Sequence, residues 1–550
     1  MDGWGALNDH SITQWKAVIA FAGVAVLGWA VLAAYDGRFA AGRKLRDALL
    51  ILVAAAACSS WFNFGHYHYG PFLHWYELYH YYLGAKYPEL GYTRLYDCTV
   101  VAEDQYAHLG PQLEHLRLRN LATNELGTGA DALAHPERCT DYFTTERWHD
   151  FQEDSDFFRR RSSWQFWSGA LVDHGYNATP VWSLTAGTLA NMGPASDDMM
   201  SNLGTLDVLS LIAMAGFIGW AFGWRTLCAA LIFFGCEYPG RYWWTGGAFL
   251  RTDWLCLTVA SVCLMKKQRP LGAGFALGWA TLLRVFPGFL GLALVTQVVA
   301  VCVRERRIVV APQVRRFIAG AALAAALLVP LASWRLHGRD SWTAFVHNSQ
   351  KHLNTPVTNN MGLKSLLAYD AKLRVLKLFD PTLRDQFEPW KQAQRATFAH
   401  RRPLFWLLAV AALVLFGAAL ATEPPWVALA LGSGLVLIVA QVTCYYYVLF
   451  IVLALLDERL RWASAALALA AALSDLIPLW YTQEDDCYVL ISEAWLVLVV
   501  ALALGLLFES RRRALLPPSA EVEEVKTKGK SDKPAKTGRQ RVSRGRGRRR

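Results

Sequence analysis

Long apolar runs, separated by shorter polar stretches, recur along most of the chain. A run of about 20 apolar residues is long enough to cross a bilayer as an α-helix. Helix is the expected conformation there, because no water is present to satisfy the backbone N–H and C=O groups. The pattern predicts about thirteen membrane-spanning helices, at residues 14–35, 46–63, 203–222, 226–240, 248–265, 270–284, 287–303, 316–334, 403–421, 426–441, 443–456, 461–480 and 488–508.

The spacing of these runs divides the chain into six regions. Only 18% of the residues are charged, against about 25% in soluble proteins, which again indicates a protein largely solvated by lipid. We expect an all-α polytopic membrane protein with two long polar loops, and loops of that length usually serve a function. The regions are two N-terminal transmembrane helices (1–63), a first long loop (64–202), a transmembrane core (203–334), a second long loop (335–401), C-terminal transmembrane helices (402–509) and a basic tail predicted to be disordered (510–550).

Clusters of Lys and Arg in the short loops predict how the helices are oriented. Cytoplasmic loops of membrane proteins carry an excess of Lys and Arg. With an odd number of helices and the N-terminus outside, all the basic clusters fall on the cytoplasmic side. Both long loops then lie outside, which predicts a multi-pass protein of the inner membrane with two periplasmic loops. The clusters are 38–46, 266–269, 304–316, 457–461 and 511–513.

Most of the positive charge lies in the tail. Residues 521–550 hold twelve Lys or Arg and four Asp or Glu, which accounts for +8 of the formal net charge of +11. A basic tail on the cytoplasmic face is attracted to anionic lipid head groups, and we favour that partner over RNA, which charge alone also permits. The sequence contains no P-loop and no GxGxxG motif after a strand, so neither nucleotide handling nor a specific nucleic-acid partner is expected.

The ten cysteines show no CxxC spacing. Most of them lie in apolar runs, where cysteine packs as a small hydrophobic side chain. Cys98 and Cys139 differ, because both lie in the first long polar loop. In a periplasmic loop the two can form a disulfide, and the alternative is two free thiols.

The stretch HWYELYHYY, residues 74–82, places one carboxylate among aromatic rings shortly after the second apolar run. On a short helix, His74 and His80 lie three residues to either side of Glu77 and so neighbour it. One interpretation is an interfacial belt, in which Trp and Tyr lie at the lipid head groups and the charged side chains face water. The wider sequence favours another interpretation, in which Glu77 has a chemical role.

The longer stretch ELYHYYLGAKYPELGYTRLY resembles the first-loop motif of GT-C glycosyltransferases. It is most similar to the polyprenol-phosphate-mannose-dependent mannosyltransferases and to the related large family of bacterial integral-membrane glycosyltransferases. Glu77 stands where that family has an Asp just after a spanning helix. Tyr81 and Tyr82 stand at its aromatic positions, and Gly91 and Tyr96 stand at its closing Gly and Tyr.

Two departures and two weaker matches accompany this resemblance. Glu77 replaces the usual Asp, which lengthens its reach by one methylene, and an extra helix at 14–35 precedes the motif. TLLRVFPGFLGLAL (281–294) is similar to the family's sixth-helix region, where a basic residue, here Arg284, precedes an aromatic–Pro pair. TNNMGLKSLL (358–367) is similar to the family's Asn-rich loop. The resemblance therefore implies a GT-C-like fold.

The resemblance implies transfer of a sugar from a polyprenyl-phosphate donor to a glycan or lipid acceptor on the outer face of the inner membrane. Such a transfer needs a base for the acceptor hydroxyl and a cation for the departing phosphate. Glu77 is the candidate base, and no cofactor is expected. Candidates for the donor phosphate are Arg284, Arg251, Lys351 and His352, and candidates for binding the sugar or the acceptor are His74, His80, Tyr81, Asp173, Asn177 and His347.

Ordinary structural roles compete with these assignments. Arg251 can pair locally with Asp253, and Arg284 can extend to the lipid head groups. The basic and His residues of the second loop can simply be solvated. LVDHGYNATPVW (171–182) can form a turn before a re-entrant helix at 181–192.

Metal binding and transport are further alternatives. A divalent ion at Asp485 and Asp486 is one metal hypothesis, and zinc is the other. The runner-up function is a secondary transporter or lipid flippase, which would have paired charges near the middle of the membrane and repeated halves. Neither feature is clear in the sequence, but Asp207, Arg251 and Asp253 keep that hypothesis open. A membrane scaffold would explain the basic tail but not the long loops. The candidate zinc ligands are His66, His68, His74 and Glu77.

Overall fold

The computed structural model confirms a predominantly helical protein. The described residues are 8–68, 70–336 and 339–515. Within them, four short strands pair into two antiparallel sheets, β1 (Arg117–Arg119) with β2 (Leu126–Thr128) and β3 (Asn360–Met361) with β4 (Val442–Thr443).

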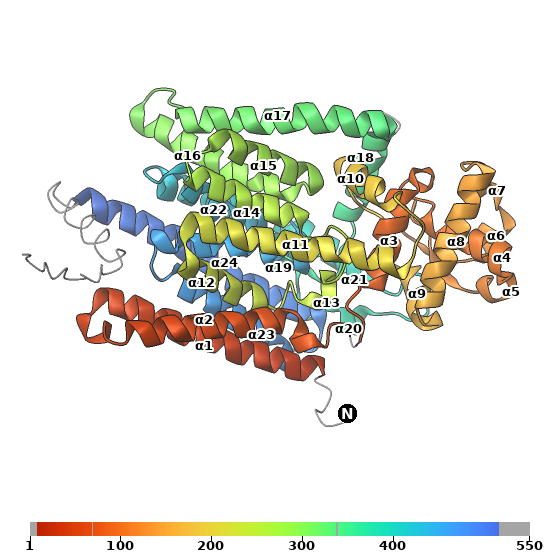
Figure 1. Ribbon diagram of the computed structural model, residues 1–550, viewed down its shortest axis with the longest axis horizontal. Helices are drawn as coiled ribbons and strands as arrows, with labels where there is room; N and C mark the ends of the chain where they lie inside the picture. The colour runs from red at the N-terminus through yellow and green to blue at the C-terminus, as the bar shows by residue number, and fades with distance from the viewer. Residues whose placement is uncertain (1–7, 69, 337–338, 516–550) are drawn as a thin grey trace, which may run out of the picture.

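Among the described residues, seven helices are long and apolar enough to cross a membrane. They form most of the helical bundle of Figure 1, so the chain is a multi-pass membrane protein. These helices are α1 (Asp9–Tyr35), α11 (Asp197–Phe222), α16 (Phe289–Glu305) with the short 3-10 helix η4 (Phe286–Gly288) before it, α17 (Pro312–Arg335), α21 (Glu388–Leu420), α23 (Ala463–Trp480) and α24 (Glu484–Leu515).

The other apolar runs are also helical but are shorter or begin with charged residues. They fill the spaces between the long helices, and η5 is buried along most of its length. Because a 3-10 helix rises about 2.0 Å per residue, the 15 residues of η5 extend about 30 Å. These elements are α2 (Arg43–Trp61), α12 (Trp224–Cys236), α14 (Asp253–Lys266), α15 (Pro270–Leu283), α22 (Pro425–Val439) and η5 (Cys444–Glu458).

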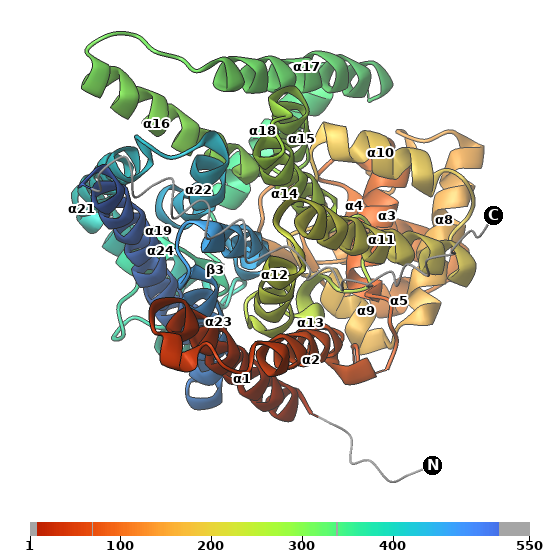
Figure 2. The ribbon, with the colours of Figure 1, turned by 60° about the vertical axis from the view of Figure 1, so that its left-hand side comes forward.

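Residues 63–196 form a compact helical unit at one end of the bundle, which we call the loop domain (Figures 1 and 2). Its helices are η2 (Asn63–Gly65), α3 (Trp75–Lys86), η3 (Pro88–Leu90), α4 (Leu95–Ala107), α5 (Gly110–Leu113), α6 (Ala130–Ala134), α7 (Glu137–Thr140), α8 (Thr145–Arg161), α9 (Trp164–Ala170) and α10 (Pro180–Ala190). The second long loop and two short connections add α18 (Arg339–Leu353), α19 (Leu363–Ala368), α20 (Val375–Leu378), α13 (Tyr242–Thr245) and η1 (Gly37–Phe39).

Local sequence signals account for the start of α10. The Thr179 hydroxyl accepts the N–H of Trp182 at 3.1 Å, and Pro180 occupies the first turn of α10. Pro lacks an N–H that would need a partner there, and Thr is a preferred N-cap. This helix lies where the sequence predicts a re-entrant helix.

Glycine allows α15 and α17 to pack with their backbones in close contact. A Cβ atom on Gly274 would lie 1.8 Å from the carbonyl oxygen of Phe317, and one on Gly320 would lie 2.0 Å from that of Leu271. Small residues at such crossings are typical of helix pairs in membranes, where close van der Waals packing drives association. This packing fixes α15, whose C-terminal end carries Arg284.

Three predicted boundaries differ from the structure because helices continue beyond their apolar runs. α11 begins at Asp197 and α21 begins at Glu388, so both start inside the predicted long loops. α24 continues to Leu515, so its last turns lie in the predicted tail. The rest of the tail, 516–550, and its predicted lipid partner lie outside the described residues.

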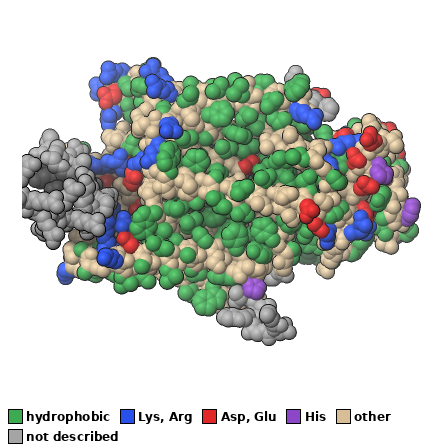
Figure 3. All heavy atoms as spheres, in the orientation of Figure 1, with side chains coloured by type: hydrophobic (Ala, Val, Ile, Leu, Met, Phe, Trp, Pro, Cys, Tyr) green, Lys and Arg blue, Asp and Glu red, His purple; other side chains and the backbone are tan. Residues whose placement is uncertain are grey.

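The surface agrees with a protein set in a membrane. Hydrophobic side chains cover the middle of the face shown in Figure 3, and Lys and Arg gather at the end opposite the loop domain. Exposed large apolar side chains are abundant on the long helices, for example Leu407 and Val414 on α21. The apolar surface thus lies between the loop domain and an end rich in Lys and Arg.

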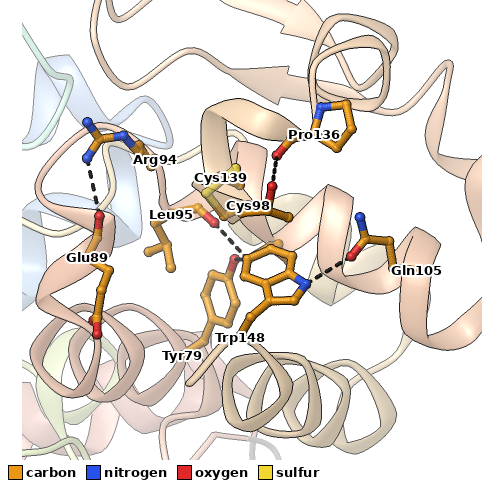
Figure 4. Close-up of a disulfide and its surroundings, with 11 residues drawn as sticks. Tyr79, Glu89, Arg94, Leu95, Cys98, Gln105, Pro136, Cys139 and Trp148 are labelled. Carbon is orange, nitrogen blue, oxygen red and sulfur yellow. Dashed lines mark hydrogen bonds between the residues drawn. A yellow bond between two sulfur atoms is a disulfide. The ribbon is translucent and has the colours of Figure 1, made fainter. Parts of the chain in front are cut away.

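A disulfide joins α4 to α7 inside the loop domain. Cys98 and Cys139 are paired, with a Cα–Cα distance of 5.3 Å, and both are buried. Figure 4 shows them near Trp148, whose Nε1 donates to the side chain of Gln105 at 2.9 Å. Of the two alternatives that the sequence left open, the structure therefore contains the disulfide and not two free thiols.

We expect the double substitution Cys98→Ser/Cys139→Ser to lower the free energy of unfolding of the loop domain by about 2–4 kcal/mol, because the disulfide constrains the unfolded chain. Thermal unfolding of the purified protein measures the effect, and Cys58→Ser, at a free cysteine in the bundle, is the control. Equal melting temperatures for the double variant and the control would contradict the prediction. So would maleimide labelling of both thiols in unreduced, denatured wild-type protein.

Candidate functional site

The first turn of α3 presents Glu77 to the bundle, and His74 fixes that turn. Nδ1 of His74 accepts the N–H of Glu77 at 3.4 Å, and its Nε2 donates to the carbonyl oxygen of Trp243 at 3.1 Å. Both bonds suit the neutral imidazole, and burial lowers the pKa of His74 well below its usual range. The ring of His74 is therefore occupied in positioning α3.

Glu77 forms a buried ion pair with Arg251. Oε2 of Glu77 lies 2.9 Å from Nε of Arg251, and the two side chains are 16% and 2% exposed. Burial raises the pKa of the Glu77 carboxyl above its usual range, and the nearby Arg251 charge opposes that rise. The sequence left open a pairing of Arg251 with Asp253; the ion pair in the structure is with Glu77.

Asp207 on α11 holds the segment that carries Arg251. One oxygen of its carboxylate, Oδ1, accepts the backbone N–H groups of Arg251 and Thr252, at 2.8 and 3.0 Å. The indole Nε1 of Trp254 donates to the carbonyl oxygen of Arg251 at 2.9 Å. The sequence suggested Asp207 only as a transporter residue, and here it is a positioning residue for Arg251.

Tyr81 brings a second arginine into the same site. The guanidinium carbon of Arg251 lies 4.6 Å from the centre of the Tyr81 ring, and that of Arg284 lies 5.7 Å from it. Arg284 also lies 5.6 Å from the ring of Trp182. The Tyr81 hydroxyl donates to Oδ1 of Asn177 at 2.6 Å. Five residues that the sequence marked as candidates, Glu77, Tyr81, Asn177, Arg251 and Arg284, thus lie together.

Both arginines have buried N–H groups without acceptors. Arg251 and Arg284 are 4% and 6% exposed. Within the described part of the chain, Nη1 of Arg251 and both Nε and Nη2 of Arg284 have no hydrogen-bond partner. Asp253 supplies an opposite charge near the two groups, but these donors remain unpaired. A buried donor without an acceptor is costly, whereas a bound anion would satisfy several at once.

Asp173 adds a second carboxylate near Glu77. Its carboxylate interacts with the hydroxyl of Tyr76 and lies near the charge of Glu77. The next residue, His174, is hydrogen-bonded through Nδ1 to Oδ1 of Asn124 at 2.9 Å. This chain of contacts links Glu77 to the turn between β1 and β2.

The structure places four other candidates away from the arginines. His80 is buried against Tyr96, whose hydroxyl lies 2.7 Å from its Nε2. His347 is exposed on α18. Lys351 donates to the carbonyl oxygen of Leu121, and the His352 ring packs near that of His174, 5.9 Å between centres. The sequence alone could not show that the basic residues of the second loop lie in a different place from Arg251 and Arg284.

The hypothetical metal ligands are engaged in other contacts. The rings of His68 and His74 are close, 4.4 Å between centres, but each uses Nε2 on a backbone carbonyl oxygen. Asp486 accepts the hydroxyl of Tyr369 at 2.6 Å, and Asp485 accepts the N–H of Val375 at 2.9 Å. No group of three or more metal-binding side chains occurs in the part of the chain that the structure describes.

Aromatic residues of η5 complete the wall of the site, and the sequence analysis missed them. The Tyr445 ring lies 5.4 Å from the guanidinium carbon of Arg251, and Tyr446 packs on Trp254, 5.8 Å between ring centres. Both tyrosines line a narrow cavity together with Arg251. The run CYYY at the start of a buried segment was the available signal.

Comparison with known proteins gave no match: no family model, no curated protein and no solved structure is similar to this chain. The GT-C resemblance therefore rests on the sequence motifs alone.

We expect Arg251→Gln to lower the free energy of unfolding by about 3 kcal/mol, because it leaves Glu77 buried without its partner. Thermal unfolding measures the effect, and Arg402→Gln, at an exposed arginine of α21, is the matched control. The double variant Glu77→Gln/Arg251→Gln should recover part of the loss, since neither charge then remains unpaired. If the changes in the free energy of unfolding of the two single variants simply add in the double variant, Glu77 and Arg251 are not energetically coupled.

Proposed function

We propose that this protein is a membrane glycosyltransferase that transfers a sugar from a polyprenyl-phosphate donor to an acceptor on the outer face of the inner membrane. The observation that carries the proposal is the set of buried, unpaired N–H groups on Arg251 and Arg284, next to the Glu77 carboxylate. Planar guanidinium groups suit phosphate oxygens, to which they donate two parallel hydrogen bonds. A carboxylate and a phosphate-binding pair are the two components that such a transfer needs.

The proposed reaction uses the two arginines and Glu77 in distinct roles. The acceptor hydroxyl oxygen attacks the anomeric carbon, the bond from that carbon to the phosphate oxygen breaks, and polyprenyl phosphate leaves. Arg251 and Arg284 stabilise the charge that develops on the phosphate. Glu77 takes the proton of the acceptor hydroxyl. One carboxylate suffices for such an inverting transfer, because the phosphate leaves without protonation.

The ion pair between Glu77 and Arg251 fits this scheme as the state before the donor binds. Phosphate oxygens compete with the carboxylate for the Arg251 guanidinium. A carboxylate that loses its cationic partner in a buried site becomes a stronger base, since burial disfavours its charged form. Donor binding would thus prepare Glu77 to accept a proton.

The membrane arrangement that we propose has thirteen spanning helices in a GT-C-like fold. The seven long helices supply part of that number, and the six shorter helical elements occupy the other predicted spans. With an odd number of spans and the N-terminus outside, the loop domain also lies outside and the basic short loops lie on the cytoplasmic side. The disulfide in the loop domain supports an oxidising compartment for that side.

Secondary transport or lipid flipping is the second candidate function, and a charge cluster buried in the bundle favours it. Neither carboxylate oxygen of Asp475, on α23, has a hydrogen-bond partner within the described residues. Its charged neighbours are Lys16 on α1, Glu237 at the end of α12 and Arg241, and Asp475, Lys16 and Glu237 are at most 3% exposed. Ionisable residues inside a membrane often mark a transport path. Substrate-driven flux in proteoliposomes without cleavage of a sugar bond, lost in Asp475→Asn, would favour this function.

We expect Glu77→Gln and Arg284→Gln each to reduce sugar transfer at least about a hundredfold, because one removes the base and the other a charge-stabilising group. The assay measures transfer from radiolabelled polyprenyl-phosphate sugars in proteoliposomes. Glu114→Gln and Arg335→Gln, both at exposed residues, are the matched controls and should retain wild-type turnover. Full turnover in Glu77→Gln would remove Glu77 from the mechanism.

The transfer rate should rise with pH through an apparent pKa above 4.5, the ordinary value for Glu. The reason is that the base must be ionised and burial raises the pKa of Glu77. In Arg251→Gln the midpoint should move to still higher pH, because the Arg251 charge lowers that pKa. Rate profiles of residual activity between about pH 5 and 8 measure both midpoints. A wild-type midpoint at or below the ordinary value, or no shift in Arg251→Gln, would contradict the assignment.

A further inference from the structure

A large cavity lies between the loop domain and the second long loop, separate from the two buried arginines. Its volume is about 900 Å³. The turn between β1 and β2 forms one side, and the end of α18 with the following residues 353–356 forms another. Helices α19 and α21, residues 383–385 before α21, and Gln441 form the rest. No residue of this cavity was assigned a role beyond Lys351, which the sequence analysis placed with the donor phosphate.

The lining of this cavity is positively charged. Five basic and three acidic side chains line it. Two of the acids are already paired with bases of the same wall: Asp385 lies 2.5 Å from Lys391, and Glu388 lies 3.2 Å from Arg395. The remaining charged lining is Lys351, Lys364, Arg384 and Glu125.

The imidazoles near this cavity add no charge at neutral pH. Burial lowers the pKa of His174 to about 4 and that of His352 to about 3. The positive potential of the cavity therefore comes from Lys and Arg side chains, and burial lowers the pKa of two of them, Lys351 and Lys364.

The uncharged part of the lining suits a saccharide. Four amide side chains offer both donors and acceptors to hydroxyl groups. Phe398 provides an aromatic surface, and Nζ of Lys364 lies 5.3 Å from the centre of its ring. A free phosphate would need the cations alone, whereas amides with an aromatic face fit a ligand that also carries hydroxyl groups and a sugar ring. The amides belong to Asn124, Asn354, Gln394 and Gln441.

The cavity is connected to the proposed catalytic centre through hydrogen-bonded neighbours. Oδ1 of Asn124, in its wall, accepts a hydrogen bond from Nδ1 of His174, and the adjacent Asp173 interacts with Tyr76, next to Glu77. A ligand held in the cavity is therefore linked to Glu77 through the residues 124, 174, 173 and 76.

We propose that this cavity binds the acceptor, and that the acceptor is a saccharide carrying carboxylate or phosphate groups. Its identity as the acceptor rests on the proposed glycosyltransferase function, whereas binding of an anionic saccharide does not. Lys364 and Arg384 recognise the anionic groups, the amides recognise hydroxyl groups, and Phe398 packs on a sugar ring.

Binding of two oligosaccharides to the full-length protein tests the proposal without any transfer reaction. The probes are hexagalacturonate, which is acidic, and maltohexaose, which is neutral, and the protein is held in phosphatidylcholine nanodiscs. We expect calorimetric titration to give at least about tenfold tighter binding of the acidic probe, with an affinity that falls as salt is added. Glu77→Gln should bind the acidic probe as wild type does, which separates failure of this proposal from failure of the proposed function.

Variants of the cavity define the contribution of its cations. Lys364→Gln/Arg384→Gln should weaken binding of hexagalacturonate about tenfold, whereas Lys364→Arg should retain it. Lys372→Gln, at an exposed lysine of the same loop that does not line the cavity, is the matched control. Equal affinity for the two probes, absence of binding by both, or a double variant no weaker than Lys372→Gln would overturn the proposal. Loss of probe binding in nanodiscs that contain phosphatidylglycerol would assign the cavity to lipid head groups instead.

Discussion

The buried ion pair between Glu77 and Arg251 is the contact on which the site depends. It joins the first helix of the loop domain to the segment that enters α14, two parts of the chain that are far apart in sequence. Removing two charges from water is costly unless other bonds support the pair. Here His74 fixes the turn that carries Glu77, and Asp207 fixes the backbone that carries Arg251. Because both backbones are already held, little additional ordering is required of either side chain.

The ion pair with Glu77 explains why Arg251 is buried, but it does not explain why Arg284 is buried. A contact that only attached the loop domain to the bundle would need one guanidinium group, and Arg251 already supplies it through its ion pair with Glu77. Arg284 is nearly as buried, yet two of its three nitrogen atoms have no acceptor in the described residues. Each unsatisfied buried donor costs about 1–3 kcal/mol. A protein retains such a group most readily where a ligand supplies the acceptors, and the shared Tyr81 ring places that ligand beside Glu77.

Much of the fold could be predicted because a bilayer leaves a long apolar segment few alternatives to a helix. Every predicted span has a helical counterpart in the described chain, but where α11, α21 and α24 begin or end could not be predicted. Their polar turns continue the helix in water, where hydrophobicity gives no signal. The 3-10 conformation of η5 was also not predictable, since an apolar run has the same composition in either helix type.

For the site, the sequence provided the residue types but few of the pairings. Glu77 and Tyr81 came from a motif, and Arg251 stood out as a charge within an apolar stretch. Its partner could not be predicted, because the nearest carboxylate in sequence is Asp253 and the actual one belongs to another region. Lys351 was misplaced for the same reason: charge and loop membership do not report which of two basic sites a side chain faces.

The two basic sites differ in burial, and this difference suits the two substrates of the transfer that we propose. Arg251 and Arg284 are buried against aromatic rings, where an interaction between charges is several times stronger than in water. Charge develops on the donor phosphate as its bond to the sugar breaks, so stabilisation is most effective where the dielectric constant is low. Lys364 and Arg384 are partly or fully exposed to solvent, and the attraction they exert is correspondingly weaker and screened by salt. The glycosylated acceptor has to leave after every turnover, and weak, screened recognition permits that release. The strong cations are therefore best used on the reacting phosphate and the weak ones on the ligand that must exchange.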